Sequence, residues 1–197
     1  MAGGMGFALG GFEALIPARL ETFGFSPEAA GPLLALTAVG SGVAGVVAAN
    51  NPNQLRRGRV VGGVLILAFA VVYLPAAAAP TVVLLGVALL ILGAPIAPLN
   101  ALANMGLQRI LAEERQAEGF SVYPAMILIG AGSGQFGAGW LLGHYRPETL
   151  LAALAVLPAT LGVVLLLAAA RRRSQGLPPG VGCDHDPTVA DPASYAT

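Results

Sequence analysis

The chain has few charged residues. They make up only 10% of its 197 residues, whereas about a quarter of a soluble domain is charged. Because 56% of the residues are hydrophobic, a water-facing surface could not be built without large exposed apolar patches. The composition excludes an ordinary soluble domain and indicates that the lipid bilayer surrounds the protein.

Lysine is missing altogether. All ten basic residues are arginine, and ten acidic residues bring the formal net charge to zero. Without an excess of positive charge the chain has no electrostatic footprint for nucleic acid, so we expect no nucleic-acid partner. The lack of lysine, together with heavy use of alanine and glycine, indicates a GC-rich bacterial genome.

Cysteine occurs only once, at Cys183. A single cysteine excludes an intramolecular disulfide and a thiolate cluster for zinc or iron-sulfur chemistry. Asp184, His185 and Asp186 follow it, but their segment offers no scaffold that would fix a coordination geometry. We therefore predict neither a metal site nor a cofactor.

Long apolar runs are what the sequence does contain. A bilayer core about 30 Å thick needs roughly 20 apolar residues in a helix, and six such runs are bounded by charges, glycine or proline. They cover approximately residues 3–18, 29–49, 60–78, 82–105, 120–143 and 150–170. We predict an all-α membrane protein with six transmembrane helices in residues 1–173, followed by a disordered cytoplasmic tail over residues 174–197.

The arginines lie mainly on one side of these predicted helices. The opposite side has only Arg19 and Arg146. The arginine-rich side holds Arg56, Arg57, Arg59, Arg109, Arg115, Arg171, Arg172 and Arg173. Because basic residues near helix ends resist translocation, we expect a multi-pass protein of the bacterial inner membrane with both termini in the cytoplasm.

Small residues recur at helical spacing in the fifth run. Gly130, Gly134 and Ala138 form one row, and Gly139 and Gly143 extend a neighbouring one. Such rows let two helices approach backbone to backbone. We predict close packing along them, and along the shorter pair Ser41 and Gly45 in the second run.

One acidic residue, Glu13, lies well inside an apolar run. A charge there costs roughly 2.5 to 3.5 kcal/mol on insertion scales, so something must compensate it. Two interpretations remain open. Glu13 is either a proton or cation site facing a water-filled path, or a residue that pairs with a partner or reaches the membrane surface, with Arg19 as the nearest basic residue.

Three amide side chains, Asn100, Asn104 and Gln108, are spaced by four in the fourth run and share one helical face. They either line a solute path or bond neighbouring helices. Tyr123 and Gln135 are further candidates for residues that line the same solute path.

Glycine and proline interrupt the first and fourth runs most, and each of these runs opens a set of three helices. This pattern predicts a 3+3 inverted repeat, in which corresponding broken helices mark the transport site. We therefore expect Glu13 and Asn100 to face a common cavity.

Several segments together resemble a known family. Residues 10–17 read GGFEALIP, residues 31–36 read GPLLAL and residues 40–45 read GSGVAG. Their order and spacing resemble the seventh and eighth helices of bacterial major facilitator superfamily (MFS) exporters. Residues 56–59, RRGR, resemble the degenerate copy of the family's cytoplasmic loop signature, and residues 118–120, EGF, resemble the start of helix eleven.

The resemblance covers about residues 3–172 and implies the C-terminal half of an MFS transporter, helices seven to twelve. It implies a carrier that exports small molecules such as drugs or sugars by alternating access, with or without coupling to H+. The family normally has twelve helices, so it also implies a second six-helix half, either a copy of this chain or a separate one. The loop lacks the acidic residue of the family's first-half signature, which favours the second half.

Two other classes of protein compete with a carrier. A membrane assembly subunit without transport activity fits the same composition. An intramembrane enzyme would need a serine and a proton-accepting histidine, but Ser133 lacks the flanking pattern and His144 lies at a helix end. We expect no enzymatic activity.

Overall fold

The computed structural model describes residues 2–50 and 58–174, and all regular structure in these ranges is helical. The elements are α1 (Ala2–Glu21), the short 3-10 helix η1 (Pro27–Ala29), α2 (Ala30–Asn50), α4 (Gly58–Ala78), α5 (Val82–Gly93), α6 (Ile96–Ile110), α7 (Glu113–Leu142), α8 (Pro147–Leu154) and α9 (Val156–Ser174). Arg56, Arg57, Cys183 and residues 175–197 of the predicted tail lie outside the described residues, whereas Ser174, predicted as the first residue of the tail, is the last residue of α9.

Five helical segments are long and apolar enough to cross a membrane. They are Pro27–Asn50, Val60–Ala78, Val82–Ile110, Glu113–Leu142 and Pro147–Arg171. This confirms an all-helical protein with several membrane-spanning helices. Among the described helices, α1 has the length of a span but is not among these five, because it contains Glu13, Arg19 and several glycines.

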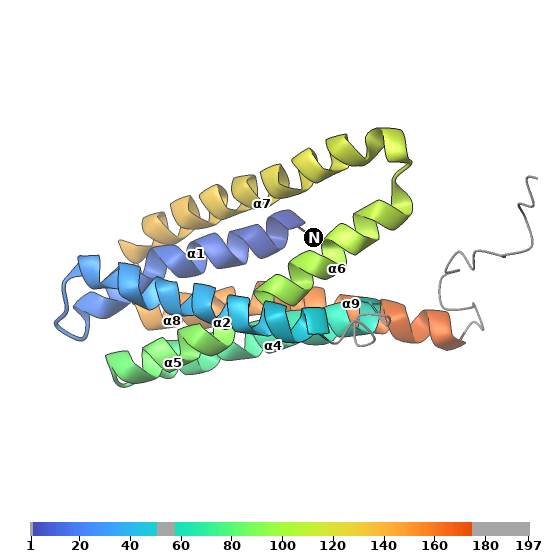
Figure 1. Cartoon of the computed structure of the whole chain (residues 1–197). Helices are drawn as coiled ribbons and strands as arrows, with labels where there is room; N and C mark the ends of the chain where they lie inside the picture. The colour runs from blue at the N-terminus through green and yellow to red at the C-terminus, as the bar shows by residue number, and fades with distance from the viewer. Residues whose placement is uncertain (1, 51–57, 175–197) are drawn as a thin grey trace, which may run out of the picture.

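The long helical rods alternate in direction. In Figure 1, α1 runs toward the left, α2 returns, α4 runs left again, α5 and α6 return, α7 runs left, and α8 and α9 return. α1 is enclosed between its neighbours rather than placed at an edge, and it buries Phe12, Leu15, Ile16 and Leu20. The start of α1 and the end of α9 therefore point the same way.

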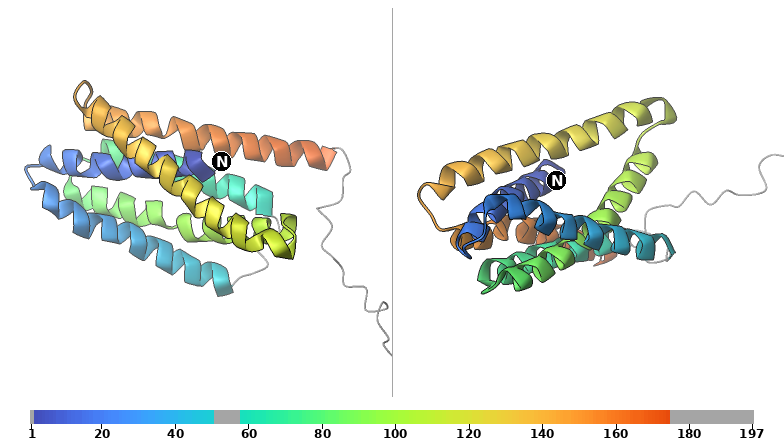
Figure 2. Two further views of the ribbon diagram at one scale, coloured as in Figure 1. Left: turned by 90° about the horizontal axis from the view of Figure 1, so that it is seen from above. Right: turned by 60° about the vertical axis from the view of Figure 1, so that its left-hand side comes forward.

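Two predicted segments are interrupted by short breaks. The fourth divides into α5 and α6 at Ala94 and Pro95, and the sixth divides into α8 and α9 at Ala155. Proline explains both breaks, because Pro95 and Pro158 cannot donate a backbone hydrogen bond and their rings crowd the preceding turn. α6 leans away from α7 beyond the turn that joins them (Figure 2).

α7 begins at Glu113, earlier than the apolar run that starts near Phe120. Glu113 and Glu114 lie in its first turn, where acidic side chains stabilise a helix N-terminus. With 30 residues, α7 is about 45 Å long, which exceeds the apolar thickness of a bilayer. Its first turns therefore extend beyond the membrane core.

The α1–α7 contact is a seam without side chains between the backbones. A Cβ on Gly10 would lie 2.6 Å from the Cα of Ala131, and a Cβ on Gly134 would lie 2.8 Å from the carbonyl carbon of Phe7. The buried residues of α7 are Gly130, Gly134 and Ala138. This confirms the predicted packing row, whereas Gly139 of the neighbouring row meets no atom within 4 Å.

The α2–α5 contact is a second seam of the same kind. A Cβ on Gly40 would lie 2.9 Å from the carbonyl carbon of Leu90, and a Cβ on Gly93 would lie 2.8 Å from that of Thr37. Ser41, which was predicted to pack closely, contributes its backbone nitrogen 3.0 Å from the Gly93 position. This seam therefore depends on Gly40 and Gly93.

A third glycine contact joins α4 to α9. A Cβ on Gly63 would lie 2.8 Å from the Leu166 side chain, and a Cβ on Gly162 would lie 2.7 Å from the Leu67 side chain. Each glycine thus receives a leucine from the opposite helix. The bundle is assembled from three helix pairs, each joined through glycine.

Candidate functional site

Glu13 lies on α1 with its side chain partly exposed. The side chain of Gln135, from α7, forms a hydrogen bond with its carboxylate. The Tyr73 side chain, from α4, lies near enough to Glu13 for the two groups to interact electrostatically. The structure therefore brings two of the sequence candidates, Glu13 and Gln135, into contact.

An aromatic cluster supports this part of α1. The Tyr73 hydroxyl donates a hydrogen bond of 2.8 Å to the carbonyl of Ala8. The Tyr73 ring meets the rings of Phe12 and Phe69 edge-on, with centroid distances of 4.8 and 5.3 Å. Because Tyr73, Phe12 and Phe69 are buried, the cluster fixes α1 against α4 beside Glu13. Sequence reasoning missed Tyr73, since a tyrosine in an apolar run gives no local signal.

A second polar pair joins α6 and α7. The Tyr123 hydroxyl donates a hydrogen bond of 3.3 Å to Oδ1 of Asn100. Asn100, Asn104 and Gln108 are exposed on α6, where it leans away from α7 (Figure 2). The predicted amide face therefore exists as an open polar surface with Tyr123 at its edge.

The two polar pairs lie at different depths. Tyr123 and Gln135 are twelve residues apart on α7, which corresponds to about 18 Å along the helix axis. Glu13 and Asn100 consequently do not touch each other. That they face one cavity stays a prediction.

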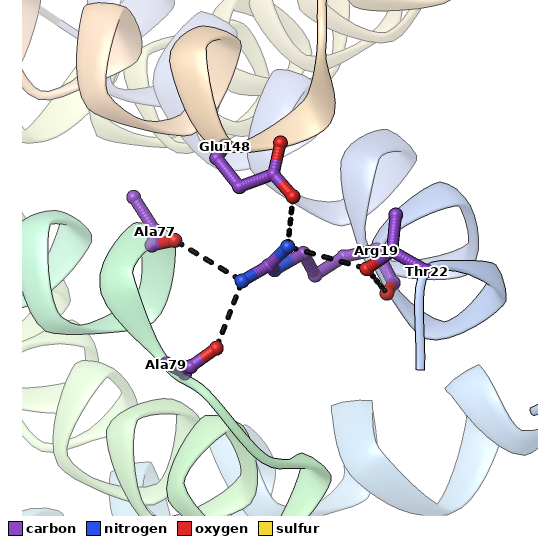
Figure 3. Close-up of polar contacts among 5 residues, drawn as sticks. All are labelled: Arg19, Thr22, Ala77, Ala79 and Glu148. Carbon is purple, nitrogen blue, oxygen red and sulfur yellow. Dashed lines mark hydrogen bonds and ion pairs between the residues drawn. The ribbon is translucent and has the colours of Figure 1, made fainter. Parts of the chain in front are cut away.

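A buried cation, Arg19, lies at the end of α1 (Figure 3). Its guanidinium forms an ion pair with Glu148 of α8. It also donates to the carbonyls of Ala77 and Ala79, at 3.3 and 2.8 Å, and to the hydroxyl of Thr22 at 3.2 Å. The guanidinium stands 4.7 Å from the centroid of the Phe23 ring.

The surroundings of Arg19 are suited to a charge pair. Ala77 and Ala79 lie at the end of α4, where carbonyls lack helical partners and the helix dipole favours a cation. Glu148 lies in the first turn of α8, where the dipole favours an anion. The pair therefore joins the ends of α1, α4 and α8. The alternative in which Arg19 compensates Glu13 receives no support from these contacts, because its carboxylate partner is Glu148.

One surface of α2 consists entirely of small residues. Gly31, Ala35, Ala38, Gly42 and Ala49 are exposed on this surface. Gly45, which was predicted to pack closely, is half-buried beside it, and a Cβ there would lie 3.1 Å from the Cβ of Ala97 on α6. Gly31 and Gly42 meet no atom within 4 Å. We call this surface the α2 small face. Membrane helices use such faces to pack against other helices.

α7 carries two contrasting open surfaces. One consists mostly of small or polar residues: Ser121, Ala125, Leu128, Gly132, Gln135 and Gly139. The other is mostly large and apolar: Val122, Met126, Ile129, Ser133, Phe136 and Trp140. The second is suited to lipid, whereas the first, which we call the α7 small face, is suited to another helix. Gln135 belongs to the small face and also contacts Glu13.

The serine and histidine considered for an enzyme are not brought together. The Ser133 hydroxyl donates to the carbonyl of Gly130 at 2.8 Å. His144 is eleven residues farther along the chain than Ser133, and its ring lies 5.5 Å from the ring of Trp140. In the described residues no group of three potential metal ligands occurs.

The fold and these polar sites define a multi-pass helical membrane protein. No known protein family, curated protein or solved structure matches the chain. The resemblance to the MFS therefore stays a prediction that is judged on the geometry of the chain itself.

Proposed function

We propose that this chain is one six-helix half of an MFS-type transporter that exports small molecules across the bacterial inner membrane. Both ends of the chain lie in the cytoplasm in this proposal. The main support is a symmetry in the glycine contacts. The same contacts recur when the first three helical rods, α1, α2 and α4, are exchanged with the last three, α5–α6, α7 and α8–α9.

The three glycine contacts repeat with constant shifts in residue number. α1 maps onto α5 and α6 with a shift of 83, α2 onto α7 with a shift of 94, and α4 onto α9 with a shift of 99. The corresponding residues are Phe7 with Leu90, Gly10 with Gly93, Thr37 with Ala131, Gly40 with Gly134, Gly63 with Gly162 and Leu67 with Leu166. Each contact reappears between the corresponding residues. For example, Gly10 contacts Ala131, and their counterparts Gly93 and Thr37 contact each other.

Reciprocal contacts of this kind are expected from a two-fold axis, because such an axis exchanges both members of every contact. Since consecutive rods run in opposite directions, an axis that exchanges rods three apart lies in the membrane plane, as in inverted-repeat transporters. The repeat also supports α1 as a sixth span, because its counterpart lies within the apolar segment Val82–Ile110.

The two small faces support a partner with further helices. Gly31, Gly42 and Gly132 are exposed, and contact with lipid does not require small residues at these positions. Close packing against helices of a second half would require them. The α2 and α7 small faces would then form the contact between halves. The partner is either a second copy of this chain or a separate six-helix half.

Within this assembly Glu13 exchanges a proton, while the face of Asn100 and Asn104 contacts the solute and Tyr123 positions Asn100. Glu13 fits the first role because it is the one carboxylate inside the bundle for which the described residues supply only a neutral hydrogen-bond partner, Gln135.

The test is solute-driven proton movement in vesicles that contain the active assembly and a trapped pH dye. A panel of lipophilic drugs and sugars is added to wild type and variants. We expect Glu13→Gln to abolish proton movement and Glu21→Gln, at the exposed end of the same helix, to leave it unchanged. Asn104→Leu is expected to raise the half-saturating solute concentration without removing proton movement.

If Glu13→Gln retains full proton dependence, the proton role is wrong. If the wild-type assembly moves no solute from the panel but forms a stable complex with other membrane proteins, the alternative of an assembly subunit is favoured instead.

A further inference from the structure

The amide face of α6 is open on its outer side. Its members, Asn100, Asn104 and Gln108, are exposed and follow one another at intervals of about 6 Å along the helix axis. Within residues 2–50 and 58–174, Asn104 and Gln108 have no hydrogen-bond partner. An amide without a partner is costly in hydrocarbon. The amide face therefore meets water, or a ligand that takes up its hydrogen bonds.

Tyr123 orients the first amide of this face. Its hydroxyl donates a hydrogen bond of 3.3 Å to Oδ1 of Asn100. The Asn100 carbonyl thus accepts from the protein, while its NH2 group remains available as two donors. Asn104 and Gln108 each add one carbonyl acceptor and two donors. Three successive turns of α6 consequently offer both donors and acceptors.

The helices on either side of this opening are uncharged at its centre. Residues 96–108 of α6 and 119–142 of α7 contain no aspartate, glutamate, arginine or histidine. The charged residues of the two helices are all exposed at the turn that joins them, where water screens them: Arg109, Glu113, Glu114, Arg115 and Glu118. At the level of Asn100 and Tyr123, α6 and α7 therefore offer a charged ligand no fixed opposite charge.

We propose that the ligand of the amide face is an uncharged polyhydroxy compound, a sugar or a sugar alcohol. A hydroxyl group both donates and accepts, so a row of hydroxyls matches side chains that do the same. A lipophilic cation leaves the amides unpaired, and a carboxylate finds no positive charge to balance its own. This inference rests on the solute contact proposed for the same face. It narrows that solute to one chemical class.

Asn104 is the position that tests the amide face, because it is the middle member and makes no hydrogen bond within the described residues. Asn104→Leu is similar in size but removes one acceptor and two donors. The ligand hydroxyls that it served are left unpaired, so we expect binding to weaken about 10- to 100-fold. Asn104→Gln restores these groups, and we expect it to recover most of the affinity.

The experiment is equilibrium dialysis of radiolabelled probes against the full chain in lipid nanodiscs. The probes are a panel of unmodified monosaccharides, disaccharides and sugar alcohols, the lipophilic cation tetraphenylphosphonium, and the dianion succinate. We expect the tightest binding within the uncharged panel. Thr160→Val is the control, because Thr160 is exposed on α9 with its hydroxyl bonded to its own helix, and we expect it to leave the affinity unchanged.

Three results overturn the inference: tightest binding of tetraphenylphosphonium or succinate, no binding of the uncharged panel to the wild type, or saccharide binding that Asn104→Leu leaves unchanged. Circular dichroism checks that the variant is folded. If it is not, Gln108→Leu makes the same comparison one turn farther along α6.

Dialysis needs no pH gradient, so the two proposals fail separately. Saccharide binding by an assembly that moves no protons overturns the proton role of Glu13 and leaves the ligand class intact. Proton movement that tetraphenylphosphonium drives and saccharides do not overturns the ligand class and leaves the transport function intact.

Discussion

Gly134→Ala is the sharpest test of the seam between α1 and α7. The added methyl would lie 2.8 Å from the carbonyl carbon of Phe7 and 2.9 Å from the backbone nitrogen of Gly11. Both neighbours are backbone atoms in the middle of a helix, so neither can move without moving α1. The helices must therefore separate by a few tenths of an ångström to about 1 Å.

The cost of this separation can be bounded. Overpacking a well-packed site by one methyl costs about 1 to 3 kcal/mol, and a gap of 0.5 to 1 Å forfeits a quarter to a half of the dispersion energy along the seam. Alanine favours a helix over glycine by about 1 kcal/mol, which offsets part of the loss. We expect the free energy of unfolding to fall by about 1 to 2 kcal/mol.

Gly132→Ala is the matched control, because it lies one half-turn away on the same helix and meets no atom within 4 Å. The free energy of unfolding is measured by adding sodium dodecyl sulfate to the protein in mixed micelles. Circular dichroism and the fluorescence of Trp140, the single tryptophan, report the transition. If the two variants differ by less than about 0.5 kcal/mol, α1 and α7 do not approach as described.

Two further predictions concern other contacts between helices. Gly40→Ala is expected to destabilise the α2–α5 seam by about 1 to 2 kcal/mol, whereas Gly42→Ala, in open space on the same helix, is expected to be neutral or slightly stabilising in the same unfolding assay. Tyr73→Phe removes the hydrogen bond from Tyr73 to the Ala8 carbonyl of α1. Because this carbonyl lies within α1 and keeps its helical donor, we expect the free energy of unfolding to fall by about 0.5 to 1.5 kcal/mol; an unchanged unfolding midpoint would show that the bond contributes nothing.

The apolar segments were predictable from the sequence because lipid imposes a length and a composition on each one. The row Gly130, Gly134 and Ala138 was predictable for a similar reason, since its spacing is a property of one helix. The break at Pro95 required the chemistry of proline rather than hydropathy. The early start of α7 was missed, because hydropathy marks where lipid begins and not where a helix begins.

The candidate site was predictable only where its signal was local. Glu13 and the amides of α6 stood out as polar groups in apolar runs. The partners of Arg19 could not be recognised in the sequence. Glu148 is 129 positions away, and two other partners are backbone carbonyls, which every residue possesses. Which polar groups meet is decided by tertiary packing. The family and the transport activity stay predictions.

The constant shifts of the glycine contacts also show which residues of the first three rods have similar counterparts in the last three and which do not. Counted with the shift of 83, Glu13 corresponds to Ile96 and Arg19 corresponds to Leu102. The seams are therefore duplicated, while neither Glu13 nor Arg19 has a charged counterpart in the second set. The residues that join the helices and the residues that carry charge therefore occupy different positions of this chain. Proteins of the same architecture should consequently be detectable by the spacing of their seam glycines, even where no charged residue is shared.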